Sequence, residues 1–304
     1  MMISKFKSII VCLFFVSLML MSCSDDATVN FLESPPPILI DERPDWSPDG
    51  NVIAYTHHPQ NDKELQNGSN QIWLLDLNTM TESFLTEGYN TDWSPDGSKI
   101  AFVKSGNIYV VDLGTREIKK LTNWSSCFFP SWSPDGRKIA FDTNHDDPKG
   151  ANAIWIMNAD GTNKKDISVH GTGEWREPAW SGDGKWILHL RYIVGIVFTE
   201  VFLMDTVGNN AVRLTNNTSP DEDPTWSYDG KHIAWGSGDK DNVGIWIMNS
   251  DGTDQHLLVR NGGYPTWSPD NKKIAFHKVD DSGKYIVLWT INIDGTNLTQ
   301  LTKP

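Results

Sequence analysis

Three acidic residues stand just before copies of one short motif, and carboxylates in that setting suggest metal chemistry. Glu42, Glu177 and Asp223 each lie three or four residues before a Trp-Ser pair, so we interpret their positions as nearly equivalent. Oxygen ligands are those that Ca²⁺ prefers. If the three side chains converge, they offer Ca²⁺ a site; the alternative interpretation is a solvated acidic rim. We expect no other cofactor.

Arginine, aromatic and amide side chains accompany these acids in the same segments. They are Arg43, Tyr89, Asn90, Phe129, Arg176 and Tyr264. Arg and Tyr are among the residue types that most often anchor protein interfaces. Together with the three acids, these six residues therefore predict a surface that binds a protein partner, with a glycan as the alternative ligand.

Histidines raise a second kind of chemistry, that of a transition metal in an enzyme. His57, His58, His145, His189 and His277 lie in or near variable segments, and imidazole is a common metal ligand. They do not recur at corresponding places, however, and His189 replaces an aromatic residue in a strand pattern. We therefore expect no catalytic residues, with a metal-dependent enzyme as the alternative.

The elements that must position these side chains are set by an internal repeat. The five-residue motif occurs six times, at intervals of 39 to 48 residues, beginning at Trp46, Trp93, Trp132, Trp180, Trp226 and Trp267. Self-similarity at such a period indicates one supersecondary unit repeated along the chain. Six units are expected.

Each unit reads as four short strands. In the second unit, the apolar strand Ile100-Ala-Phe102 follows the motif, a further strand is expected at 107–112, and a last strand ends at Leu121-Thr122. Short strands of regular spacing, with no helical periodicity between them, are typical of propeller blades. The sequence predicts an all-β fold, a six-bladed β-propeller of four-stranded antiparallel blades.

The motif itself predicts a tight turn. In Ser-Pro-Asp-Gly, Pro presets φ, Asp bonds nearby amides and Gly accepts a positive φ; Asn271 replaces Gly in the last copy. We interpret the tryptophans as apolar plates packed between blades. Both tight turns of a blade lie on one face, so the variable loops, with the candidate partner-binding residues, gather on the opposite face and at the channel mouth.

The closure of the ring has two interpretations. The last blade can use its own fourth strand near residues 298–302. Alternatively, residues 37–41 supply the outer strand, because they stand at the same offset before Trp46 as the Leu-Thr strands stand before later motifs. Strands from both ends of the chain would protect the edges of the ring. We favour a contribution from the N-terminal segment.

The N-terminus carries a separate signal. Lys5 and Lys7 precede an apolar run from Ile9 to Leu20, after which Met21-Ser22 leads to Cys23. This segment resembles a bacterial lipobox. The resemblance implies a lipoprotein signal peptide at 1–22, lipidation of Cys23, a tether at 23–40 and a propeller domain at 41–304. An ordinary cleaved signal and a membrane span are the alternatives.

Charge and cysteine content narrow the setting. The net charge is −13 and no basic stripe occurs, which argues against nucleic acid as a partner. Only Cys127 would remain in the lipidated mature domain, so no intrachain disulfide is expected there. Asp25-Asp26 behind Cys23 resembles a surface-export signal of Bacteroidetes lipoproteins. We expect a protein anchored by lipid in the bacterial cell envelope, on the periplasmic side or the cell surface.

The repeats resemble those of a known family. The pattern Pro-x-Trp-Ser-Pro-Asp-Gly, then Ile-Ala-Phe, Ile-Trp-x-Met-Asn and an Asp-Gly-Thr turn, is similar to the TolB-type (WD40-like) propeller repeat and covers Asp41 to Pro304. TolB carries a further domain before its propeller, for which residues 23–40 leave no room. The resemblance implies a non-catalytic module that binds envelope proteins.

Related propellers supply the enzymatic alternatives. Prolyl oligopeptidase relatives need a Gly-x-Ser-x-Gly elbow, and the chain contains none. Oligogalacturonate lyases use similar repeats with a metal held by histidines, which makes a sugar-acid lyase the alternative.

Overall fold

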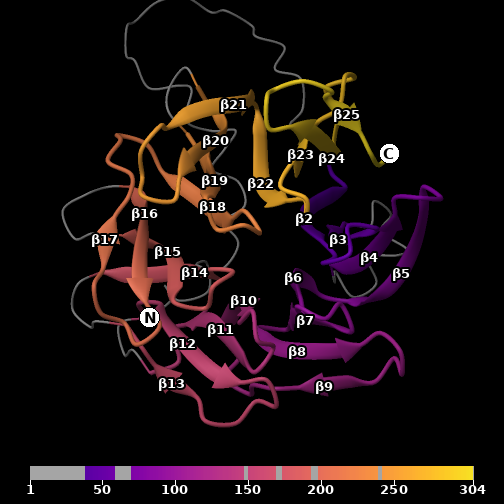
Figure 1. Ribbon diagram of the computed structural model, residues 1–304. Coiled ribbons are helices and arrows are strands. Elements are labelled where there is room, and N and C mark those ends of the chain that lie inside the picture. The colour runs from indigo at the N-terminus through magenta and orange to yellow at the C-terminus, as the bar shows by residue number, and fades with distance from the viewer. Residues whose placement is uncertain are drawn as a thin grey trace, which may run out of the picture.

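A computed structural model describes residues 38–58, 70–146, 150–168, 173–192, 198–238 and 242–303 of the protein. Within these residues, strands form six sheets that stand like blades around a central axis. Figure 1 shows the indigo strands of the first blade beside the yellow strands of the last. The predicted six-bladed β-propeller is confirmed.

Each blade runs outward from the axis in chain order. Blade 1 contains β2 (Asp41–Trp46), β3 (Val52–His57), β4 (Gln71–Asp76) and β5 (Thr81–Glu87), and blade 2 contains β6 (Tyr89–Trp93), β7 (Lys99–Lys104), β8 (Asn107–Asp112) and β9 (Ile118–Lys120). Blade 3 contains β10 (Cys127–Trp132), β11 (Lys138–Thr143), β12 (Ala153–Asn158) and β13 (Lys165–Asp166), and blade 4 contains β14 (Glu174–Trp180), β15 (Trp186–Tyr192), β16 (Thr199–Asp205) and β17 (Val212–Arg213). Blade 5 contains β18 (Asp221–Trp226), β19 (His232–Ser237), β20 (Gly244–Asn249) and β21 (His256–Arg260), and blade 6 contains β22 (Gly262–Trp267), β23 (Lys273–Val279), β24 (Tyr285–Asn292) and β25 (Thr299–Gln300).

The serine of the motif holds each tight turn. In blade 2, Ser94 Oγ donates to Asp96 Oδ1 at 2.6 Å and accepts from the Lys99 main-chain N–H at 2.9 Å. The same pair of bonds recurs in the other five motifs. Gly97 has φ +69° and Asn271 has φ +58°, as the turn requires. The sequence predicted the turn and its left-handed residue, but not the serine.

The ring is closed by both ends of the chain. The edge of β24 that faces away from β23 pairs antiparallel with β25 at Trp289 and Thr290. Farther along the same edge, β1 (Ile38–Leu39) pairs in parallel with Tyr285 and Ile286. The two interpretations of closure therefore both hold, each for one part of β24.

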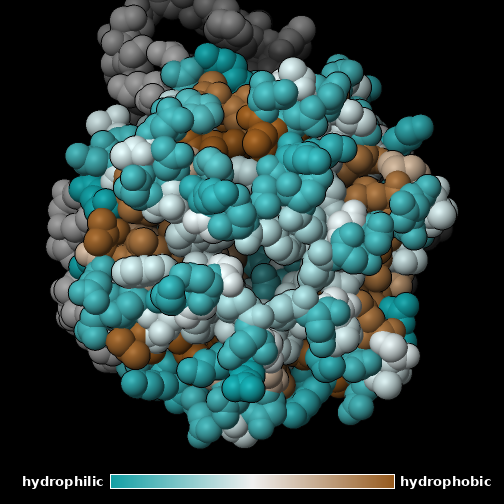
Figure 2. Space-filling view, in the orientation of Figure 1, coloured by the Kyte–Doolittle hydropathy of each residue, from teal (hydrophilic) through white to brown (hydrophobic). Residues whose placement is uncertain are grey.

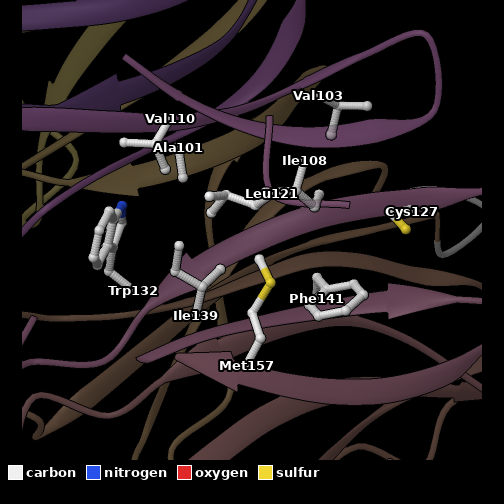
Figure 3. Packing of buried hydrophobic residues seen from close by; sticks show 10 residues of the cluster. All are labelled: Ala101, Val103, Ile108, Val110, Leu121, Cys127, Trp132, Ile139, Phe141 and Met157. Atoms are coloured by element: carbon white, nitrogen blue, oxygen red, sulfur yellow. The ribbon is translucent and has the colours of Figure 1, made fainter. Parts of the chain in front are cut away.

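The apolar core is divided among the six interfaces between neighbouring blades. Each interface holds one cluster of buried side chains. Figure 3 shows the interface of blades 2 and 3, where Ile108 and Leu121 face Ile139 and Met157. The motif tryptophans belong to these clusters, as predicted, although Trp180 and Trp226 are only half-buried.

None of the described residues forms a helix that is long and apolar enough to cross a membrane. The signal peptide predicted at 1–22, Cys23 and most of the tether lie outside the described residues.

The serine bonds of the turn lead to a stability prediction. Ser94→Ala should lower the free energy of unfolding by about 1–3 kcal/mol, because Ser94 is 4% exposed and its loss leaves the Lys99 N–H without its acceptor. Urea denaturation followed by tryptophan fluorescence measures this change. Ser83→Ala, at an exposed position of β5, is the control and should leave the midpoint in place. Equal midpoints for the two variants would contradict the role of the motif serine.

Candidate functional site at the channel mouth

One residue in the innermost strand of every blade has a left-handed backbone. These residues are Arg43 (φ 54°), Asn90 (53°), Phe129 (48°), Glu177 (53°), Asp223 (49°) and Tyr264 (53°). At each, the register between the first and second strands of the blade shifts, which defines a β-bulge. A left-handed non-glycine residue costs about 1–3 kcal/mol, so six at equivalent positions mark a place where the fold enforces strain.

The bulges turn these side chains towards the axis. In five blades the next residue is proline, which has no N–H to donate to the strand ladder and is therefore tolerated at a bulge. Together with the two residues that follow each of them, the six line one cavity of about 150 Å³. Figure 2, which looks down the axis, shows a hollow of hydrophilic residues at the centre of the ring. We call the six residues the bulge ring.

Arg43 occupies the middle of the bulge ring. Its Nη2 donates to the Tyr264 hydroxyl at 2.5 Å, and its Nη1 lies 3.7 Å from Asp223 Oδ1. The guanidinium carbon is 3.8 Å from the centre of the Tyr264 ring and 5.1 Å from that of Phe129. A cation held between two aromatic faces and a carboxylate is a strong local arrangement.

More carboxylates face this guanidinium than it can neutralise. Glu177 Oε2 accepts from the Asp223 main-chain N–H at 2.8 Å, and Glu222 directly precedes Asp223 in the strand. Burial raises the pKa of Glu222 to about 7, and burial together with mutual repulsion raises the pKa of Asp223 well above its usual range. Burial also raises the pKa of Glu177, although Arg43 opposes that shift. The mouth thus contains one arginine cation surrounded by carboxyl groups that bind protons more readily than usual.

The predicted equivalence of Glu42 with Glu177 and Asp223 is wrong by one residue. Glu42 pairs with Thr56 across the ladder, which is the place that Arg176 and Glu222 hold in their blades. Glu42 Oε1 instead contacts His58 Nε2 at 2.9 Å. Burial opposes its ionisation, but the bond from His58 and the charge of Arg43 lower the pKa of Glu42 to about 2. The equivalent of the two acids is Arg43.

Two further predicted residues stand beside the bulge ring rather than in it. Tyr89 is half-buried and packs against the cluster between blades 2 and 3. Arg176 forms an ion pair with Glu174 at 2.5 Å and is about one-third exposed. The structure therefore brings six of the nine predicted residues together at the axis and places Glu42, Tyr89 and Arg176 around them.

Two of the acids predicted to bind Ca²⁺ already lie beside a cation, the Arg43 guanidinium. Within the described ranges, no three His, Cys, Asp or Glu side chains are arranged to hold a metal ion. Arg43 supplies the positive charge between Glu42 and Asp223, at 3.7 Å from each. An ion at this mouth would have to displace the guanidinium.

The histidines also do not converge. His189 is fully buried and stacks on Trp175 at 4.5 Å, which identifies it as a core residue. His57 contacts Asp41 at 2.8 Å, and His145 stacks on Trp124 at 4.2 Å in another blade. His277 lies edge-on to Tyr264, a residue of the bulge ring, at 4.7 Å between ring centres. The arrangement offers no shared ligand set for a transition metal among the described residues.

Sequence reasoning missed a second layer of the channel. Asp45 and Asp92 stand two residues after the bulge, immediately before the motif tryptophan. Asp45 Oδ2 accepts from the Trp93 N–H at 3.0 Å, and Asp92 Oδ2 accepts from the Trp132 N–H at 2.6 Å. Each carboxylate therefore ties its blade to the next. The sequence does contain a sign of this layer: only two repeats have Asp directly before the motif tryptophan, where the other four have Ser, Ala or Thr.

Six four-stranded blades around a narrow polar channel define a six-bladed β-propeller with a candidate binding site at one channel mouth. The chain belongs to the TolB beta propeller domain family, whose profile matches residues 17–198. The Tol-Pal system protein TolB of Francisella tularensis subsp. mediasiatica (strain FSC147) is 31% identical over 96 residues. That match spans 31% of this chain and 22% of the Francisella protein.

Solved structures agree in fold. The chain is similar to TolB from Acinetobacter baumannii, with a TM-score of 0.71 and 20% identity over 83% of this chain and 63% of that one. It is also similar to an oligogalacturonate lyase from Vibrio parahaemolyticus, with a TM-score of 0.55 and 14% identity over 83% and 90% of the two chains. At such identities the likeness extends to the fold alone.

The channel carboxyl of Asp92 predicts a pH dependence of stability. Burial raises its pKa to about 7, above the unfolded value of 3.8. The stability that the protonated carboxyl contributes is therefore fully present below about pH 4 and is lost as the pH rises through 7. Asp92→Asn cannot ionise and retains an acceptor for the Trp132 N–H. Its melting temperature should therefore exceed that of the wild type at pH 8, and the difference should shrink towards pH 4.5 in thermal scans.

Asp96→Asn is the matched control in the same blade. Bonds from Ser94 and Ser98 lower the pKa of Asp96 to about 2, so its stabilising effect is present above pH 4. This variant should be less stable than the wild type by a constant amount from pH 5 to 8. A pH-independent difference for Asp92→Asn would show that Asp92 is ionised throughout.

Proposed function

We propose that the protein is a non-catalytic binding module of the bacterial cell envelope, which binds a protein partner at the mouth formed by the bulge ring. The observation that carries this proposal is the set of six strained, non-glycine residues that the fold turns towards one channel mouth. Strain of this kind clusters where a surface is pre-organised for a ligand. Family membership supports the same class of function.

The chemistry of the mouth favours a protein as ligand. Phe129 and Tyr264 present aromatic surface, and Arg43 lies between them with a partly exposed guanidinium. Aromatic and arginine side chains at the centre of a polar rim are the usual anchors of protein interfaces. A matched relative is called a Tol-Pal system protein, and we extend only the idea of an envelope partner to this chain.

The anchoring of the protein is part of the proposal. Cys23 follows an apolar run in a lipobox-like setting, and β1 (Ile38–Leu39) is the first strand that pairs with the propeller. Lipidation of Cys23 would hold the domain at a membrane through the part of the predicted tether that precedes β1. The periplasmic side and the cell surface both fit this anchoring.

Capture of envelope proteins tests the binding mouth. Detergent-solubilised envelope is passed over the wild-type protein and over the double variant Phe129→Ala and Tyr264→Ala. We expect the partner to be captured at least about tenfold less well by the variant, because truncated anchors commonly cost 2 kcal/mol or more. Quantitative mass spectrometry gives the ratio.

Phe84→Ala is the control for loss of an aromatic side chain. Phe84 lies on β5 at the outer edge of blade 1 and is 52% exposed. This variant should capture the partner as well as the wild type does. Loss of capture in Phe84→Ala, with retention in the double variant, would move the interface to the blade edge and reject the mouth.

The lipid anchor has its own test. Cys23→Ala should abolish metabolic labelling with palmitate and shift the protein from the membrane pellet to the soluble fraction. Cys12→Ala, in the apolar run of the same segment, should change neither. Retained labelling in Cys23→Ala would refute lipidation at this residue.

A further inference from the structure

Two carboxylates deep in the channel have no cationic partner. Asp45 and Asp92 come from neighbouring blades, and each accepts a main-chain N–H through Oδ2. Among the described residues, no lysine, arginine or histidine forms an ion pair with either. Burial raises the pKa of both groups, and the charge of Asp92 raises that of Asp45 further. The pair lacks a positive charge.

A buried amide oxygen in the same cavity also lacks a donor. Asn90 is 7% exposed, lines the cavity with the two aspartates, and its Oδ1 is buried without a hydrogen-bond partner. Leaving a buried acceptor unpaired is costly, so such a group calls for an explanation. Together the three side chains present carboxylate and amide oxygens to the cavity, which is also lined by Thr91 with its unpaired hydroxyl.

The far end of the channel differs from the mouth at the bulge ring. Tyr228 stands where four of the six motifs have proline, and its hydroxyl donates to the Trp46 carbonyl at 3.2 Å, from blade 5 to blade 1. Trp46 directly follows Asp45, so this bond holds the phenol next to the backbone of that aspartate. Burial raises the pKa of Tyr228, and the charges of Asp45 and Asp92 raise it further. Tyr228 is nevertheless 44% exposed. This end therefore combines an accessible aromatic ring with unneutralised carboxylates.

We propose that this end of the channel binds a primary alkylammonium group, which enters beside Tyr228. An ammonium has one charge and three N–H donors, which match Asp45, Asp92 and Asn90. Its alkyl stem can lie against the Tyr228 ring, where a cation–π contact adds stability. Asp45, Asp92 and Asn90 line the cavity of about 150 Å³, which has room for such a group. The ligand is a free alkylamine or the lysine side chain of a bound protein.

The site lies deeper in the cavity whose mouth is the bulge ring, and Asn90 belongs to both. Arg43 occupies that mouth, so a cation would meet repulsion from that side. The capture test changes Phe129 and Tyr264, whereas the ammonium test changes Asp45 and Asp92, so either proposal can fail while the other stands.

Binding should release a proton. Near pH 7 the carboxyl pair retains a proton, because the pKa of Asp92 is about 7. When R–NH₃⁺ binds, a carboxylic acid gives its proton to the buffer and becomes the carboxylate that pairs with the ammonium. Alkylamines stay charged well above this range, so affinity should rise between pH 6 and 8.

Thermal shift and calorimetry on the full, detergent-solubilised chain test the proposal. The probes are n-butylammonium, its neutral analogue n-butanol, and tetramethylammonium, each at about 1–50 mM, where a millimolar ligand gives measurable stabilisation. Only n-butylammonium should raise the melting temperature. Calorimetry in buffers of different ionisation enthalpy should show proton release. Equal shifts with n-butanol would overturn the proposal.

Variants locate the site. Asp45→Asn with Asp92→Asn keeps both main-chain bonds but removes the charge, and should weaken n-butylammonium binding at least about tenfold. Asp135→Asn, an exposed turn carboxylate in blade 3, is the control and should bind normally. Tyr228→Pro restores the usual motif residue and should weaken binding about two- to fivefold. Unchanged binding in the double aspartate variant would refute the site.

Two further probes identify the ligand. If Nα-acetyl-lysine N-methylamide binds as well as n-butylammonium, the channel accepts a lysine of a protein; if it fails while n-butylammonium binds, the ligand is a free amine. Stabilisation by submillimolar Ca²⁺ with no response to n-butylammonium would make the pair a metal site and overturn the proposal.

Discussion

The whole molecule depends on the packing of each blade against the next. A single four-stranded blade is too small to bury its own apolar side chains, and the core is accordingly divided among six interfaces. The interface between blades 6 and 1 must form like the others, since Trp46 and Tyr55 are buried against Ala275 and Leu288. The shared edge of β24, paired with β25 and with β1, holds this last interface together from both ends of the chain.

Closing the ring brings six inner strands to one axis, and the bulges determine what they present there. A regular strand would direct alternate residues into the neighbouring blades. The left-handed residue at each bulge instead directs Arg43, Glu177, Asp223 and their equivalents into the channel. The interfaces stabilise the strained positions, and the channel gains a charged lining that no single blade could hold.

The two ends of the channel have different electrostatics. At the bulge ring, Arg43 neutralises part of the charge of Asp223 and Glu42 and lies between two aromatic rings. Two residues deeper, Asp45 and Asp92 accept main-chain bonds but meet no cation among the described residues. The first end therefore presents a cation between aromatic rings, whereas the second presents buried carboxyl groups.

The sequence alone determined the repeat, the number of blades, the four strands in each and the left-handed turn residues, because these follow from local chemistry repeated six times. It also selected six of the residues at the channel mouth, since they precede the motif at a fixed distance. Only the tertiary structure decided the register. A one-residue bulge separates Glu42 from the bulge ring, makes Arg43 the equivalent of Glu177, and pairs Asp45 with Asp92. Which side chains meet at the axis depends on ring closure, and contacts between separate blades leave no pattern within a single repeat.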